Sequence, residues 1–81
     1  MQVHVLFFAQ ARERAGCASA ELALPDGSHL EDALAALARD YPALEPLWPQ
    51  LAIAVDGHLA RHGAALAEGS ELALLPPVSG G

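Results

Sequence analysis

The sequence contains no lysine and only one cysteine. Its 81 residues carry four basic side chains, all of them arginine, against ten acidic ones, so the formal net charge is −6. Proteins that follow the phosphate backbone of a nucleic acid need a basic stripe, and the lack of one argues against that class. Without lysine, the chain cannot accept an isopeptide bond on its own side chains. The single cysteine, Cys17, excludes an internal disulfide.

Long apolar runs are missing as well. No run approaches the roughly 20 residues that cross a bilayer, and the first ten residues lack the basic region that precedes the apolar stretch of a signal peptide. We therefore expect a cytoplasmic protein. Hydrophobic residues still make up 53% of the chain, more than a disordered chain carries, which predicts one folded domain. Its acidic surface favours docking onto a basic protein partner.

The hydrophobic patterns predict a mixed sheet crossed by one helix. Four stretches with strand character lie at residues 3–8, 19–24, 51–55 and 71–75. A short return strand is expected at 58–60, after the hairpin turn at Asp56-Gly57. We expect the first and last strands to lie side by side in the middle. This order predicts an α+β fold of the β-grasp (ubiquitin-like) type, with four to five strands; a ferredoxin-like sheet is disfavoured because there is only one full-length helix.

The main helix is the clearest element. Apolar residues recur with helical spacing from Leu30 to Tyr41. Ser28 and Glu31 have the spacing of a capping box at its start, and Pro42 is expected to end it.

Two connecting stretches have weaker patterns. Residues 9–16 favour a short helical turn that ends at Gly16. Residues 42–50 contain three prolines and are expected to form an irregular crossover, with Trp48 covering an edge of the core. Phe7 is expected inside the core, whereas Phe8 and Leu59 are candidates for exposed apolar residues, which mark protein interfaces.

The last six residues, PPVSGG, have unusual physical properties. Pro76 and Pro77 hold the backbone extended, and six residues reach about 20 Å. Val78 and Ser79 follow as small spacers. We therefore divide the chain into a domain, 1–75, and an extended tail, 76–81.

The tip of this tail is narrow and carries one ionised group. Gly80 and Gly81 have no Cβ, so they can pass through a channel too narrow for other residues. The α-carboxylate of Gly81 is a poor electrophile until an ATP-using enzyme converts it to an acyl adenylate. A persulfide would then yield a thiocarboxylate, and a lysine amine would yield an isopeptide. We expect the tail to act inside another protein's active site.

No group of side chains in the sequence supports catalysis by this chain alone. Cys17 could relay sulfur, but a lone cysteine is more often a small packing residue. His58 and His62 have the i, i+4 spacing of metal ligands on a helix, yet glycines flank them and no third ligand is near. The scattered carboxylates are more typical of a solvated surface than of a catalytic pair: Glu13, Glu21, Asp40, Glu45 and Glu68.

Three segments, VLFFAQARERAG, LAEGSEL and LLPPVSGG, resemble the MoaD/ThiS sulfur-carrier family, in the branch that serves molybdopterin synthase. The resemblance covers the whole chain and implies the β-grasp fold. It also implies that a ubiquitin-activating-type (MoeB-like) enzyme uses ATP to adenylate Gly81. Sulfur from a donor such as a cysteine desulfurase would then make Gly81 a 1-thioglycine. The chain itself would bind no cofactor and no metal.

The same resemblance implies a partner. The loaded tail would enter the large (MoaE-like) subunit of the synthase, in a heterotetramer, and give sulfur to cyclic pyranopterin monophosphate. The catalytic side chains would belong to that subunit. By position, Phe8, Leu59 and Leu75 match apolar interface residues of the family, although Leu75 stands where an aromatic is often found.

Three other functions stay open at this point. The chain could carry sulfur for another pathway, such as thiamine thiazole synthesis or tRNA thiolation, although thiazole carriers are typically shorter. It could be a ubiquitin-like modifier that is attached to lysines of other proteins. It could also be a passive adaptor, which would keep its activity when Gly81 is deleted.

Overall fold

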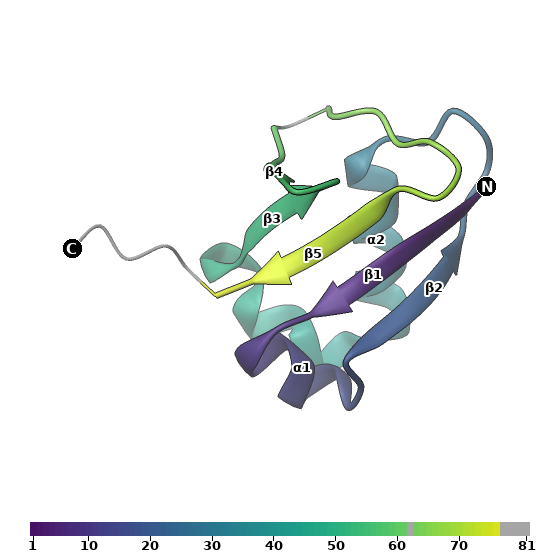
Figure 1. Ribbon diagram of the computed structural model, residues 1–81. Helices are drawn as coiled ribbons and strands as arrows, with labels where there is room; N and C mark the ends of the chain where they lie inside the picture. The colour runs from purple at the N-terminus through teal and green to yellow at the C-terminus, as the bar shows by residue number, and fades with distance from the viewer. Residues whose placement is uncertain (62, 77–81) are drawn as a thin grey trace.

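A mixed sheet forms one layer of the protein (Figure 1). The computed structural model describes residues 1–61 and 63–76, and within them the sheet has five strands in the order β2-β1-β5-β3-β4. Their bounds are β1 Gln2–Phe7, β2 Ser19–Ala23, β3 Ala52–Val55, β4 His58–Leu59 and β5 Glu71–Leu75. All five predicted strands are present, and β3 begins one residue later than expected.

The two central strands come from opposite ends of the sequence. β1 and β5 run parallel, with Val5 opposite Leu72, while β2 and β3 flank them in antiparallel pairing. The prediction that the first and last strands lie side by side is confirmed. β5 therefore ends in the middle of the sheet, and Pro76 follows it there.

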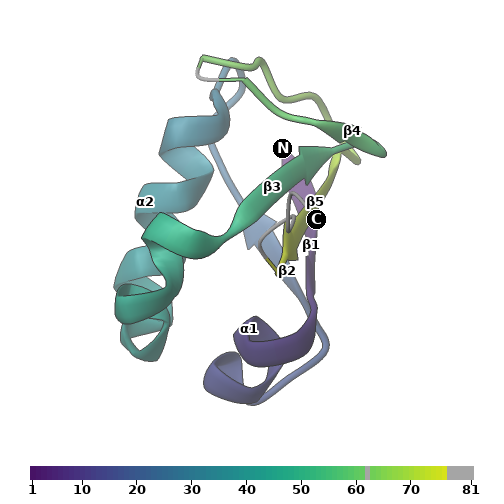
Figure 2. The same ribbon diagram turned by 90° about the vertical axis from the view of Figure 1, so that its left-hand side faces the viewer.

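The helices cover a single face of the sheet (Figure 2). They are α1 Ala9–Ala15, α2 Leu30–Asp40 and the 3₁₀ helix η1 Pro42–Gln50. Between them and the sheet lies the core, to which the central strands contribute fully buried side chains of Val3, Val5, Leu72 and Leu74. Phe7 is only 2% exposed, as predicted, and its ring packs edge-on against Tyr41 with centroids 5.2 Å apart. None of the helices in the described ranges is long and apolar enough to cross a membrane.

The start of α2 differs from the prediction. The capping box of Ser28 and Glu31 is wrong by one residue: His29 is the N-cap, and the carboxylate of Asp32 accepts its N–H at 2.8 Å. The hydroxyl of Ser28 instead donates to the carbonyl of Pro25 at 2.7 Å. Glu31 accepts the N–H of Gly63 at 2.8 Å, which ties the loop after β4 to the helix. The carbonyl of Ala64 in the same loop accepts the Leu30 N–H at 2.8 Å, so the loop takes part in capping the helix, which a local motif alone did not reveal.

The segment 42–50 is regular, contrary to the prediction of an irregular crossover. Proline at the first position of η1 suits a helix start, because the missing N–H needs no partner there. Leu44 and Leu47 are buried, and Trp48 packs against the core as expected. The helix ends also match the prediction. α2 ends at Asp40, and α1 ends at Ala15 with Gly16, at φ +80°, as its C-cap.

Candidate functional site

No helix of the described chain covers the face of the sheet that lies opposite the helices (Figure 2). Toward the ends of β1 and β5 this face is apolar. The apolar part consists of the residues that alternate with the buried ones in β1 and β5 and of the β3 and β4 residues on the same face by strand register. Phe8, which continues β1 in extended conformation, also belongs to it. The register places Leu6 beside Ala73, and Ala52 beside Leu75. We call this surface the apolar sheet face: Leu6, Phe8, Ala52, Ala54, Leu59, Ala73 and Leu75.

Two large side chains of the apolar sheet face are strongly exposed. Phe8 is 42% exposed and Leu59 is 67% exposed. Among the described residues, these two are the large hydrophobic side chains that are exposed. Leu75, the third residue predicted at an interface, is partly buried on the same face. Uncovered apolar surfaces of this kind are typical of protein interaction sites. The structure brings the three predicted residues to one surface, and their part in an interface stays a prediction.

The tail begins at the edge of this surface. The N–H of Phe8 donates to the carbonyl of Leu74 at 3.1 Å, so the end of β1 is fixed beside the end of β5. Pro76 follows Leu75 and is exposed. The remaining predicted tail residues, Pro77, Val78, Ser79, Gly80 and Gly81, lie outside the described residues.

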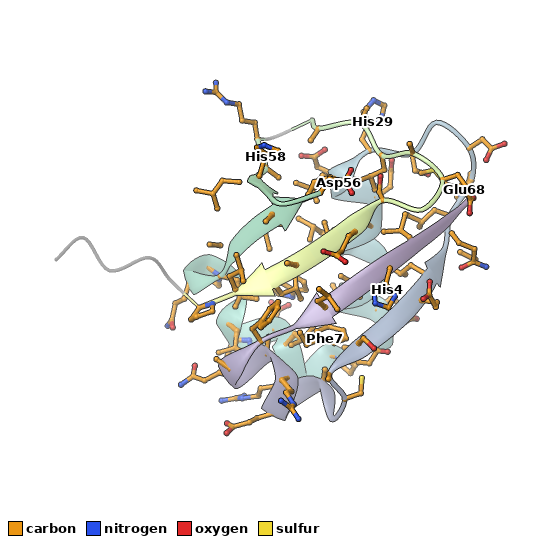
Figure 3. All side chains as sticks on the ribbon, in the orientation of Figure 1. His4, Phe7, His29, Asp56, His58 and Glu68 are labelled. Atoms are coloured by element: carbon orange, nitrogen blue, oxygen red, sulfur yellow. The ribbon has the colours of Figure 1, made fainter. Side chains whose placement is uncertain are left out.

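A polar pair that the sequence did not reveal lies on the outer surface near the other end of β1. His4 and Glu21 are opposite one another on β1 and β2, and the His4 Nδ1 lies 2.6 Å from the Glu21 Oε1 (Figure 3). Only the strand register could have paired them, and residue spacing along the sequence does not give that register. The pair marks where the apolar sheet face gives way to a polar surface.

Cys17 behaves as a packing residue. It is partly buried against the core, and its thiol lies 3.9 Å from the carbonyl oxygen of Ala15. Burial raises the pKa of the nearby Tyr41 hydroxyl, and the Cys17 side chain and the Asp40 carboxylate raise it further. These contacts favour the packing interpretation over a sulfur relay.

The histidine and carboxylate candidates are separate from one another. His58 lies in the short strand β4, not on a helix, and its Nδ1 is 3.2 Å from the carbonyl of Asp56 (Figure 3). His62 lies outside the described residues, and the described ones contain no group of three potential ligands suited to a metal ion. The five carboxylate residues named above are all exposed, as expected for a solvated surface.

The described structure is that of a ubiquitin-like β-grasp protein. SAMP1 from Haloferax volcanii has the same fold, with a TM-score of 0.88 at 35% identity over the full length of both chains. The ThiS family model matches residues 5–81, so the chain belongs to the ThiS family.

Two further relatives connect this family to molybdopterin. A protein of Chlamydomonas reinhardtii named molybdopterin synthase sulfur carrier subunit is 40% identical, with both chains covered completely. In Helicobacter pylori 26695, a chain in the protein–protein complex of subunits 1 and 2 of molybdopterin-converting factor matches with a TM-score of 0.73 at 28% identity, again over both full chains. The MoaD/ThiS resemblance of the sequence is thereby confirmed.

Proposed function

We propose that this protein is the sulfur carrier subunit of a molybdopterin synthase. The observation that carries the proposal is the position of the tail: its root leaves the central strand β5 beside an uncovered apolar surface. A partner that covers the apolar sheet face is therefore placed to receive the residues that follow Pro76. The similarity to the Chlamydomonas reinhardtii carrier subunit supports this assignment.

Docking would depend on the apolar sheet face. Phe8 and Leu59 are exposed enough to insert into a partner, and such large apolar side chains dominate binding energy when they are buried at the centre of an interface. The large, MoaE-like subunit is the partner that this proposal requires. The likeness to the complex of two molybdopterin-converting factor subunits supports a partner of that kind.

The chemistry would take place on Gly81. An ATP-dependent, MoeB-like enzyme would join the carboxylate to AMP and release pyrophosphate. A persulfide, supplied by a cysteine desulfurase, would displace AMP, and reduction of its S–S bond by a thiol would leave the terminal sulfur on the glycine. That thiocarboxylate would transfer its sulfur to cyclic pyranopterin monophosphate, and two such transfers would make the dithiolene. These steps require no catalytic side chain from the carrier. This agrees with the exposed carboxylates of the chain, which form a solvated surface and not a catalytic pair.

The test uses the chain prepared as its Gly81 thiocarboxylate. We would mix it with the large subunit and cyclic pyranopterin monophosphate, and follow the intact mass of the carrier together with molybdopterin formation. The expected result is exchange of one sulfur for one oxygen on the carrier as molybdopterin accumulates. A chain lacking Gly81 is the control, and molybdopterin formation supported by that chain would refute the carrier role.

Protein modification is the second candidate. The likeness to SAMP1, a name that stands for small archaeal modifier protein 1, favours it. In that case the activated Gly81 would pass to lysine amines of other proteins. Incubating the chain with its activating enzyme, ATP and cell extract would yield covalent conjugates that survive reducing agents. The absence of lysine in this sequence means that chains of this protein on its own side chains would not form.

A further inference from the structure

Figure 1 shows the corner where β1 runs into α1 and where η1 and β5 end. Residues of this corner line a hollow. Its volume is about 320 Å³. Five apolar residues line it: Phe8, Ala9, Leu47, Leu51 and Pro76. The hollow also includes two amide side chains, Gln10 and Gln50, both on exposed residues.

The chemistry of the hollow suits one large apolar group. It is mostly apolar, and its volume is at the lower end of the range of about 300–1,000 Å³ that binding pockets occupy. An aliphatic or aromatic side chain could fill it, and the two amides could bond to the backbone that carries that side chain. No charged residue lines it, so a charged ligand would find no partner there.

The backbone at the hollow is strained. Ala9 has φ +50°, a conformation that residues with a Cβ seldom adopt. This turn starts α1 immediately after Phe8, which is exposed. Strain that persists at one exposed position often marks a functional surface.

We propose that this hollow receives one apolar side chain of the large subunit, next to the entry point of the tail. The inference rests on the proposed function. Phe8 belongs both to the hollow and to the apolar sheet face, so the two surfaces are continuous. Pro76 belongs both to the hollow and to the tail, so a protein that takes up the residues after Pro76 covers the mouth of the hollow. The anchor side chain fixes where the tail starts, and thereby which residue of the tail reaches the reacting centre.

Two other occupants of the hollow would give different experimental results. The chain's own residues 77–81 could fold back into the hollow, or a second copy of the chain could insert a side chain. The first requires the tail, and the second produces self-association that increases with concentration. Experiment can therefore distinguish both cases from an anchor side chain supplied by the large subunit.

The experiment measures the dissociation constant between the full-length carrier and the purified large subunit by calorimetry. Ala9→Asn places an amide in the hollow at a backbone position that asparagine tolerates, so the fold is retained. Gln50→Glu places a charge at the hollow without changing the shape of the side chain. Gln2→Glu, exposed near the opposite end of β1, is the matched control.

We expect Ala9→Asn and Gln50→Glu each to raise the dissociation constant about tenfold or more, because an apolar partner side chain would face an unpaired polar group. Gln2→Glu should leave it within about twofold. The same loss is expected in a chain that ends at Pro76, since the anchor belongs to the partner. Unchanged affinity in both hollow variants overturns the proposal, as does a loss that vanishes when the tail is removed. Self-association of the wild-type chain in ultracentrifugation, abolished by Ala9→Asn, would also overturn it.

Failure of the anchor proposal can be distinguished from failure of the proposed function. If the thiocarboxylate chain transfers no sulfur yet binds the large subunit, the carrier role fails while the anchor remains testable by affinity. If sulfur transfer proceeds and the hollow variants bind normally, only the anchor fails. The two results come from different measurements on the same proteins.

Discussion

The backbone N–H of Phe8 donates a hydrogen bond to the carbonyl oxygen of Leu74 at 3.1 Å. This bond continues the parallel pairing of β1 and β5 beyond the end of β1 and fixes an exposed aromatic side chain beside the last residues of β5. Residues from opposite ends of the sequence thereby form one surface. Pro76, the first residue of the tail, follows β5 beside this surface, and the proposed function rests on that arrangement.

Leu59 offers a direct test of the apolar sheet face. It is 67% exposed on β4, so Leu59→Glu should leave the thermal midpoint nearly unchanged. Binding to the large subunit should weaken at least tenfold, because a carboxylate would be buried in an apolar interface. Calorimetry with both proteins measures this. Ala35→Glu, exposed on α2 on the opposite side of the molecule, adds the same charge and should bind normally.

Equal affinities for wild type and Leu59→Glu would exclude this face from the interface. A thermal midpoint that falls in step with the affinity would point to a structural role for Leu59 instead.

The tail can be tested independently of docking. Gly80→Val adds a branched side chain near the tip of the tail, and we expect it to abolish sulfur transfer by preventing entry into a narrow channel. The thermal midpoint should not change, since the tail is predicted to lie outside the domain. Transfer from the Gly81 thiocarboxylate is followed by intact mass. Ser79→Ala, which makes the tail no wider, is the matched control and should transfer sulfur at the wild-type rate.

A large loss of stability in Gly80→Val would show that the tail packs within the fold. Normal transfer would show that the channel is wider than two glycines require.

Much of the fold could be predicted from the sequence because its strands and its main helix have strong local patterns. Alternation in β1 and β5 and the helical spacing from Leu30 to Tyr41 identify the faces that are buried. The predicted capping box of α2 was wrong by one residue, because the local pair that forms it is His29 with Asp32. The position is also fixed by a tertiary bond that a local motif does not show: the Leu30 N–H donates to the carbonyl of Ala64 at 2.8 Å.

The candidate site was predictable only in part. Phe8, Leu59 and Leu75 were identified by resemblance, and the register explains why they share a face. Leu6 and Ala73 join them through strand pairing, which no spacing along the sequence specifies. The hollow at Ala9 depends on a left-handed backbone at a residue that does not favour it, so a sequence pattern gives no sign of it.

The contact between Glu31 and Gly63 should contribute measurably to stability. The Glu31 carboxylate accepts the Gly63 N–H at 2.8 Å across the loop that follows β4. Glu31→Ala removes this charged acceptor and should lower the free energy of unfolding by about 1 kcal/mol. Urea unfolding measures the change, and hydrogen exchange of the Gly63 amide should become faster. Glu13→Ala, exposed on α1, is the control and should stay within about 0.5 kcal/mol of wild type.

The raised pKa of Tyr41 predicts that the stability of the fold decreases at alkaline pH. Its pKa in the folded state is raised, first by burial and then by Cys17 and Asp40, so folding favours the neutral hydroxyl. A group whose pKa is raised by folding contributes stability that is complete below its unfolded pKa, about 10 for tyrosine, and is lost as the pH rises through the folded pKa. Stability should therefore fall above about pH 10, and Tyr41→Phe should make that fall shallower.

Tyr41 is the only tyrosine of the chain, so the near-ultraviolet absorbance of its phenolate reports its titration directly. We expect a midpoint above the ordinary value in the folded protein and at the ordinary value in urea. Cys17→Ala should move the folded midpoint back toward the ordinary value, because one of the causes of the shift is removed. A folded midpoint at or below the ordinary value would contradict the raised pKa of this hydroxyl and the alkaline loss of stability derived from it.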